Sequence, residues 1–204
     1  MKKIIPFFRA GYESNSYLIV SNGEAALIDA GVSSEAVLSA LSREGATLRY
    51  ILLTHGHFDH TLNANDLRLK TGAKLLIHKD DEEMLTDASK SALLTFFGKN
   101  DTVGRADGVI SDGDEIALGN EAITVLHTKG HSKGSVCYQI GDSLFTGDTL
   151  FKRGYGRFDL YGGDPSELLD SLKRLSTLDG GISIYPGHGE SGAINDAINA
   201  LGII

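Results

Sequence analysis

Seven histidine and aspartate side chains, placed in one dense motif and three short ones, are the residues of this sequence best suited to chemistry. The dense motif spans six positions and contains His55, His57, Asp59 and His60. Imidazole nitrogen and carboxylate oxygen are common ligands of divalent metals. The spacing is too tight for one helical face, where two metal ligands stand four residues apart. The motif follows the apolar stretch 50–53, which indicates a loop at the end of a buried strand.

Three later motifs complete the set with His131, Asp148 and His188, each next to a glycine. Each motif follows a run with strand character, at residues 122–126, 142–145 and 182–185. Glycine allows sharp turns and close approach of the backbone to a ligand. Together the four motifs supply five histidines and two aspartates. This number is sufficient for two metals with a bridging water between them.

The elements that must position these side chains alternate between strand and helix patterns. Strands are expected near the N-terminus and at 16–20, 25–29, 50–53, 74–77, 115–118, 122–126, 135–140, 142–145 and 182–185. Helices are expected at 33–44, 63–70, 79–85, 165–175 and 193–201, with Asp164 as an N-cap and Pro165 in the first turn. Such alternation predicts layers of helix against sheet. Segment 86–107 fits either a surface helix that docks its apolar side or a rim over the active site.

The sequence resembles the metallo-β-lactamase-fold hydrolases, and within them the glyoxalase II (hydroxyacylglutathione hydrolase) branch. The resemblance runs from about Tyr17 to His188 and rests on the His-x-His-x-Asp-His signature and on segments 128–135, 144–151, 154–157 and 185–189. It implies a four-layer αββα sandwich, with the metals at the edge between two sheets. We expect residues 1–204 to form one domain of this fold.

The resemblance also implies a role for each ligand. One metal would take His55, His57 and His131, and the other would take Asp59, His60 and His188, with Asp148 bridging the two. Asp59 and Asp148 are the expected catalytic carboxylates. Zinc is the default metal, while iron and manganese also suit these ligands. Redox relatives carry Glu at the position of His57, so a histidine there favours hydrolysis.

The expected reaction is hydrolysis of an acyl thioester such as S-lactoylglutathione by hydroxide generated at the metals. Arg157, Lys152 and Arg153 are the candidate substrate contacts. Asp159 stands where the branch usually has an aromatic residue, and the sequence ends shortly after His188, without the C-terminal helical extension that binds glutathione in the branch. Two alternatives stay open: a mononuclear iron persulfide dioxygenase that uses His55, His131 and Asp148, and a lactone or phosphoester hydrolase with the same metal site.

Composition narrows the possible partners and location. The formal net charge of −8 disfavours nucleic acid and anionic membranes as partners. The apolar part of the N-terminal segment is too short for the apolar region of a signal peptide. The expected lack of an export signal also disfavours a true β-lactamase. The single cysteine, Cys137, lies in a strand pattern and is expected to be buried and unreactive. We therefore expect a cytoplasmic enzyme that acts on a small molecule, with its oligomeric state open, and we interpret His78 and His127 as structural or supporting residues.

Overall fold

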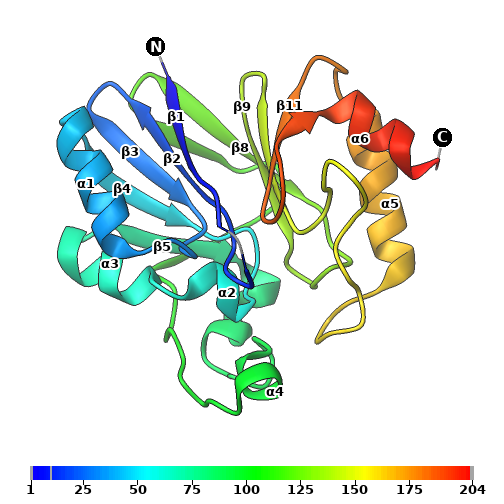
Figure 1. The fold of residues 1–204 in the computed structure, drawn as a ribbon, viewed down its shortest axis with the longest axis horizontal. Coiled ribbons are helices and arrows are strands. Elements are labelled where there is room, and N and C mark those ends of the chain that lie inside the picture. The colour runs from blue at the N-terminus through cyan, green and yellow to red at the C-terminus, as the bar shows by residue number, and fades with distance from the viewer. Residues whose placement is uncertain (1, 10, 203–204) are drawn as a thin grey trace.

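Two six-stranded sheets face each other in the computed structural model, which describes residues 2–9 and 11–202 (Figure 1). The first sheet contains, in this spatial order, β1 (Lys3–Phe7), β2 (Ser16–Ser21), β3 (Glu24–Ile28), β4 (Thr47–Leu52), β5 (Lys74–His78) and β6 (Gly108–Ile110). Strands β1 to β3 pair antiparallel, and β3 to β6 pair parallel. The sheet is therefore mixed, and its parallel part carries the first metal-ligand motif at the end of β4.

The second sheet runs through the later part of the chain. It contains, in this spatial order, β12 (Gly192–Ala193), β11 (Ser183–Pro186), β10 (Ser143–Gly147), β9 (Val136–Ile140), β8 (Glu121–His127) and β7 (Glu115–Leu118). All neighbours pair antiparallel except β10 and β11, which are parallel. The carboxyl ends of β10 and β11 therefore lie at the same edge of the sheet, and each is followed by a predicted ligand.

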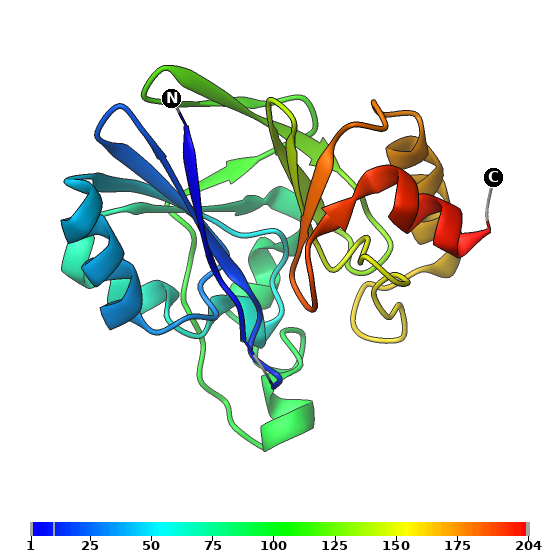
Figure 2. The same ribbon diagram turned by 45° about the horizontal axis from the view of Figure 1, so that its top comes forward.

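Helices cover the outer faces of both sheets, which gives the four layers of an αββα sandwich (Figures 1 and 2). The helical segments are α1 (Ser34–Glu44), α2 (Phe58–Thr61), α3 (Ala64–Thr71), the 3₁₀ helix η1 (Lys79–Leu85), α4 (Leu93–Phe97), α5 (Pro165–Ser176) and α6 (Ile194–Leu201). Helices α1 and α3 pack on the first sheet, and α5 and α6 pack on the second. The fold predicted from the sequence is confirmed.

The central strands are apolar on both faces because each face packs against a different layer. In β2, Leu18 and Val20 join the cluster under α1 and α3, while Tyr17 and Ile19 join the cluster between the sheets. Successive side chains of a strand point to opposite faces, so a strand buried on both sides carries an uninterrupted apolar run. The same division occurs in β10, where Leu144 faces α5 and α6 and its neighbour Phe145 faces the other sheet.

Local sequence signals placed most helix ends well. Asp164 caps α5 as predicted, because its side chain accepts hydrogen bonds from the backbone N–H groups of Ser166 and Glu167. Helical spacing in the sequence predicts an apolar stripe of Leu168, Leu169, Leu172 and Leu175 on this helix. Leu169 departs from it, since it is 39% exposed while the other three are buried. The short strands β6 and β12 were not predicted from the sequence. Among the described residues, none of the helices has the length and apolar character needed to cross a membrane.

Candidate metal centre

The loops that follow β4, β8, β10 and β11, together with α2, bring the seven predicted ligands together at one edge of the two sheets. The loop predicted for the first motif ends at His57, because Asp59 and His60 lie in α2. Parallel pairing places the loops after β10 and β11 next to each other, and the Gly187 N–H donates to the Gly147 carbonyl over 2.8 Å. A Cβ atom at Gly187 would stand 2.4 Å from Asp148 Oδ1 and 2.6 Å from His60 Cε1. The glycine before His188 is therefore required by the close approach of the backbone to two other ligands.

The first three-histidine set has its nitrogens in contact distance. His131 Nε2 lies 3.1 Å from His55 Nε2 and 2.9 Å from His57 Nδ1. Two nitrogens on one tetrahedral zinc stand about 3.3 Å apart, given Zn–N bonds of about 2.05 Å. The three nitrogens are therefore spaced as they would be around one ion. The three side chains are 3% exposed or less, so the ion would be largely shielded from water.

The second set combines one carboxylate and two histidines. Asp59 Oδ2 lies 3.1 Å from His188 Nε2 and 3.6 Å from His60 Nε2. Asp148 lies between the sets: its Oδ1 is 3.4 Å from His60 Nε2, and its Oδ2 is 3.6 Å from His188 Nε2 and 3.8 Å from His131 Nε2. Its two oxygens therefore reach donors of both sets, as a bridging carboxylate would.

Two buried polar atoms at the centre, His60 Nε2 and Asp148 Oδ1, have no hydrogen-bond partner. A buried polar atom without a partner is costly, and most such atoms in native proteins are satisfied. A cation between these two atoms would satisfy both. The donor set and this pair of unpartnered atoms fit a bound divalent metal.

The electrostatics of the first set favour neutral, ligand-ready imidazoles. Burial, followed by the neighbouring histidines, lowers the pKa of His55 well below its ordinary value. Burial and the proximity of His131 lower the pKa of His57 to about 3. A neutral imidazole has the free lone pair that metal coordination requires. Both side chains are therefore able to bind a metal at neutral pH.

The second set has the opposite balance of charge. Burial opposes protonation of His60, but Asp29, Asp59 and Asp148 raise its pKa well above the ordinary value. Burial would raise the pKa of Asp148, yet His60 and the other nearby histidines hold it well below its ordinary value. Surroundings that favour a proton at His60 also favour a divalent cation in its place.

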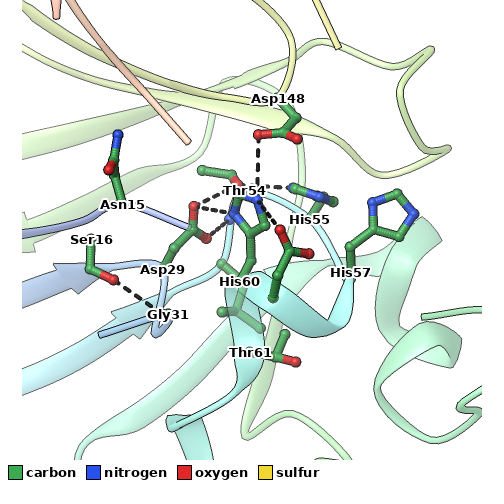
Figure 3. A network of polar contacts seen from close by, with 12 residues as sticks. Asn15, Ser16, Asp29, Gly31, Thr54, His55, His57, His60, Thr61 and Asp148 are labelled. Atoms are coloured by element: carbon green, nitrogen blue, oxygen red, sulfur yellow. Dashed lines mark hydrogen bonds and ion pairs between the residues drawn. The ribbon is translucent and has the colours of Figure 1, made fainter. Parts of the chain in front are cut away.

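For His55, His60 and His131, hydrogen bonds from outside the two sets fix which ring nitrogen faces the metal position; Figure 3 shows those of His55 and His60. His60 Nδ1 donates to Asp29 Oδ2 over 2.8 Å, and His131 Nδ1 donates to the Arg157 carbonyl over 2.6 Å. His55 Nδ1 lies 3.1 Å from Thr54 Oγ1. With Nδ1 carrying the proton in each ring, the lone pair is on Nε2, which points into the centre. Such partners orient metal ligands and fix their tautomers.

Asp29 is a functional residue that the sequence reasoning missed. Its carboxylate also accepts from the backbone N–H and the hydroxyl of Thr54, at 2.8 and 2.9 Å. It adopts a left-handed backbone conformation with φ of 56°, which is uncommon for a residue other than glycine. The available signal was its position: like the ligands, it follows a buried strand and precedes a small residue and a glycine, at Ala30 and Gly31.

Asp81, at 0% exposure in η1, is a second missed residue and ties two ligand loops together. Its carboxylate accepts from the Gly56 N–H over 3.1 Å, from the Ser132 hydroxyl over 2.6 Å and from the Gly134 N–H over 2.7 Å. Gly56 separates His55 from His57, and Ser132 follows His131. The sequence offered no signal for Asp81 beyond its place in an acidic run.

We expect Asp81→Asn to lower the free energy of unfolding by about 2–3 kcal/mol. The carboxylate accepts hydrogen bonds through both oxygens, whereas the NH₂ group of an asparagine would face hydrogen-bond donors and leave them without an acceptor. Asp80→Asn is the matched control, since Asp80 is exposed on the same short helix. Urea unfolding at equal metal loading measures both variants. A loss for Asp81→Asn no larger than that for Asp80→Asn would contradict the role.

The three predicted substrate contacts lie at the edge of this centre. A cavity of about 340 Å³ opens onto His57, Asp59, His131, Asp148 and His188, and Arg157 lines it. Arg157 Nε and Nη2 donate to the Asp159 carboxylate, at 2.7 and 2.8 Å. Lys152 and Arg153 line a separate hollow that shares His188 with the cavity, and Lys152 pairs with Glu190 over 2.7 Å.

Segment 86–107 contributes α4 to the wall of the same cavity through Phe96 and Phe97. The two rings are 50% and 45% exposed, and no residue of α4 is buried. The alternative of a helix that docks its apolar side on the core is therefore wrong. The position of α4 agrees with the rim interpretation.

His78 and His127 form a third histidine cluster, away from the seven ligands. Together with Asp80 their ligand atoms lie within 4.8 Å of one another. However, the two rings are stacked, with centroids 4.0 Å apart and 23° between their planes. The lone pairs of imidazole nitrogens lie in the ring plane, so nearly parallel rings cannot direct them at one ion. The arrangement is a structural contact, and His127 Nε2 bonds the Lys133 carbonyl over 2.8 Å.

Cys137 is buried within β9, as predicted. Burial raises the pKa of its thiol to about 11. The thiol is therefore protonated at neutral pH and is no candidate for a nucleophile.

Comparison with known proteins agrees with this geometry. Among curated proteins, the chain is 33% identical over 180 residues to the probable metallo-hydrolase YqgX of Bacillus subtilis, which covers 87% of this chain and 85% of the relative. It is 36% identical over 181 residues to a hydroxyacylglutathione hydrolase of Anaeromyxobacter dehalogenans. That match covers 88% of this chain but 63% of the relative, so the chain spans under two thirds of that enzyme.

Solved structures with similar folds include three with sequence identities near 30%. BLEG-1, a B3 metallo-β-lactamase, matches with a TM-score of 0.87 and 32% identity, covering 98% of this chain and 97% of that one. TTHA1623 in a di-iron-bound form matches with a TM-score of 0.81 and 31% identity, covering 94% and 95%. ETHE1 from Myxococcus xanthus matches with a TM-score of 0.79 and 29% identity, covering 95% and 80%.

The family model of the metallo-beta-lactamase superfamily matches residues 9–188. This range contains all seven predicted ligands and ends at His188, the last of them. The chain belongs to the metallo-β-lactamase superfamily.

Proposed function

We propose that this chain is a binuclear metal-dependent hydrolase that cleaves an acyl thioester, such as S-lactoylglutathione. The observation that carries the proposal is the arrangement of two three-residue ligand sets with Asp148 between them, its oxygens 3.4 Å from His60 Nε2 and 3.8 Å from His131 Nε2. The similarity to hydroxyacylglutathione hydrolases supports the thioester as the substrate class. We also propose that residues 1–204 act as one domain in the cytoplasm, without nucleic acid or membrane as a partner.

The proposed ligands keep the assignment made from the sequence: His55, His57 and His131 for one ion, Asp59, His60 and His188 for the other, and Asp148 for both. Two divalent ions held there would lower the pKa of a shared water, so that hydroxide is available near neutral pH, and would polarise the substrate carbonyl. Asp59 and Asp148 supply the anionic charge that holds the pair of cations. Asp29, Thr54 and the Arg157 carbonyl keep the imidazole lone pairs aimed at the centre.

The leaving group needs little help from the protein. A thiolate has a pKa near 8.5, so it can depart largely without protonation. No side chain of the cavity therefore has to serve as a general acid, in contrast to amide hydrolysis. The ionisable groups that line the cavity are the proposed ligands, the paired Arg157 and the Tyr12 phenol.

We expect close to two metal equivalents per chain, because seven donors exceed what one ion can use. Elemental analysis after reconstitution with zinc, iron or manganese in separate samples measures the stoichiometry and the preferred metal. The di-iron form of the similar TTHA1623 makes iron a serious competitor to zinc. A firm single equivalent in all three samples would contradict the binuclear assignment.

We expect only weak dependence on the glutathione part of the substrate. Two of the three candidate cations are engaged: Arg157 binds Asp159 and lowers the pKa of that carboxyl to about 2, and Lys152 binds Glu190. Arg153 is the third, so less positive charge is available for the glutathione carboxylates than the sequence suggests. With one acyl group carried on glutathione and on N-acetylcysteamine, kcat/KM should differ by less than about tenfold. A loss above about 100-fold on truncation, about 2.7 kcal/mol, would show that a glutathione site exists.

The second candidate is a mononuclear iron dioxygenase that acts on a persulfide. The similarity to ETHE1 favours it, and His55, His131 and Asp148 would hold the iron. His131 Nε2 lies 3.1 Å from His55 Nε2 and 3.8 Å from Asp148 Oδ2. Oxygen uptake with glutathione persulfide, combined with no turnover of any thioester, would establish this candidate and overturn the hydrolase.

The similarity to BLEG-1 adds β-lactams to the substrates to be assayed, together with lactones and phosphoesters. All of these reactions would use the same metal site. The thioester remains the preferred substrate if its kcat/KM exceeds those of the other three classes on one preparation with fixed metal content.

A further inference from the structure

Four aromatic side chains form one wall of the cavity that opens onto the proposed ligands. We name this set the aromatic rim: Tyr12, Phe58, Phe96 and Phe97. The Phe97 ring centroid lies 5.1 Å from that of Tyr12 and 5.3 Å from that of Phe58, and Phe96 lies 6.3 Å from Phe58. These separations are those of interacting aromatic rings. The rim is therefore one continuous apolar surface, although its members come from three separate segments of the chain.

Most of the aromatic rim is exposed instead of being packed in the core. Tyr12 is 54% exposed, Phe96 50% and Phe97 45%. Large apolar side chains gathered at the surface are unusual in a soluble fold unless they contact another molecule. Their common feature is the cavity, whose volume is about 340 Å³. This volume lies within the range of pockets that hold small molecules.

The rim is attached directly to the ligand loop. The backbone N–H of Phe58, which stands between His57 and Asp59, donates to the Ser91 carbonyl over 3.0 Å. The next residue, Ala92, begins α4 in a left-handed conformation with φ of 67°, a costly geometry for a residue with a Cβ atom. The chain therefore adopts a strained turn where α4 brings Phe96 and Phe97 to the cavity.

The charge nearest Phe96 is paired. The Arg157 guanidinium lies 5.6 Å from the Phe96 ring centroid, and its Nε and Nη2 donate to the Asp159 carboxylate. Leu160 adds another apolar side chain to the lining of the cavity. A substrate group that lies along the aromatic rim would therefore meet mainly carbon surface, while His131 and Asp148 line the same cavity beside its reacting carbonyl.

We propose that the aromatic rim binds an apolar acyl group, either an aryl-substituted or a medium-length alkyl chain, in preference to a small hydroxylated group such as lactoyl. This proposal rests on the proposed thioester hydrolysis and narrows its substrate class. Burial of apolar surface contributes roughly 25 cal/mol per Å², so a phenyl or hexyl group that fills this wall would gain substantial binding. The occupant is the acyl part of the substrate, because the rim and the ligands line one cavity.

The test compares acetyl, lactoyl, hexanoyl and phenylacetyl thioesters, all on N-acetylcysteamine. The wild-type enzyme is expected to show kcat/KM at least about 30-fold higher for hexanoyl or phenylacetyl than for acetyl or lactoyl. Phe96→Ala and Phe97→Ala should each reduce that preference at least about fivefold, measured as the ratio of hexanoyl to acetyl kcat/KM on one preparation. Leu94→Ala is the matched control, since Leu94 is 44% exposed on α4 and does not line the cavity.

A binding measurement removes the dependence on turnover. Calorimetric titration with S-hexyl- and S-phenethyl-N-acetylcysteamine, thioethers that cannot be hydrolysed, should show binding that Phe97→Ala weakens and Leu94→Ala does not. Equal kcat/KM for all four acyl groups, with normal acetyl turnover, would overturn the acyl site and leave the hydrolase intact. A change of oligomeric state in Phe96→Ala or Phe97→Ala, with unchanged acyl preference, would assign the rim to contact between copies and also overturn it. No turnover of any thioester would overturn the proposed function itself.

Discussion

Asp148→Ala is expected to reduce kcat/KM for a thioester by about 1,000-fold or more, and His188→Ala by about 100-fold or less. The difference follows from position. The Asp148 oxygens approach donors of both ligand sets, whereas His188 approaches Asp148 and the donors of the second set. His188 is also the more exposed of the two, with 32% of its side chain accessible against 12% for Asp148.

The losses must be compared at equal metal content, because part of either effect could come from lost metal. Each variant is therefore reconstituted, its metal content is measured, and kcat/KM is expressed per occupied centre. Asp142→Asn, at a carboxylate that is 82% exposed near Lys2, serves as the control and should leave activity unchanged. Equal losses for Asp148→Ala and His188→Ala per occupied centre would contradict a bridging role for Asp148.

Asp29→Asn is expected to weaken metal binding at the second set by about 10- to 100-fold. The Asp29 carboxylate accepts from His60 Nδ1 and from both donors of Thr54. An amide that turns its NH₂ toward His60 would favour the tautomer with the proton on Nε2, the nitrogen that faces Asp148. That proton would have to leave before a metal could bind, so affinity falls although no ligand has been removed.

Competition with a chelator measures the affinity, and ¹⁵N NMR of the imidazoles reports the His60 tautomer. The expected outcome is a weaker second equivalent, a nearly unchanged first one and a proton shifted to Nε2 in the metal-free protein. Asp142→Asn again serves as the control. A uniform loss of both equivalents with the tautomer unchanged would indicate general destabilisation and would contradict the specific role of Asp29.

Much of the fold was predictable because its signals are local. The apolar runs at 16–20 and 25–29 predicted the hairpin of β2 and β3, and Asp164 with Pro165 predicted the start of α5. These patterns depend on side-chain alternation and on helix capping, which act within a few residues. The order of strands in the two sheets was not predicted, since no local signal specifies which distant strands pair.

Segment 86–107 shows where local reasoning failed. Its apolar run suggested a helix docked on the core as readily as a rim, and periodicity could not separate the two alternatives. What decides between them is the strained turn at Ala92 and the hydrogen bond from Phe58 to Ser91, both of which depend on the surrounding structure. The prediction that Leu169 lies on the buried face of α5 was wrong for a related reason, since the packing of α5 on the second sheet leaves that position at the surface.

The sequence by itself determined which side chains are proposed as metal donors, because metal ligands are restricted to a few residue types and these stand just after buried strands, next to glycines. Only the tertiary structure decided how those donors are supported and what surrounds them. Asp29, Asp81 and the aromatic rim come from segments that are distant in the chain, and each acts through contacts across the fold. Such contacts leave no periodicity or spacing in the sequence, since they arise only when the two sheets pack and bring the loops of both halves to one edge.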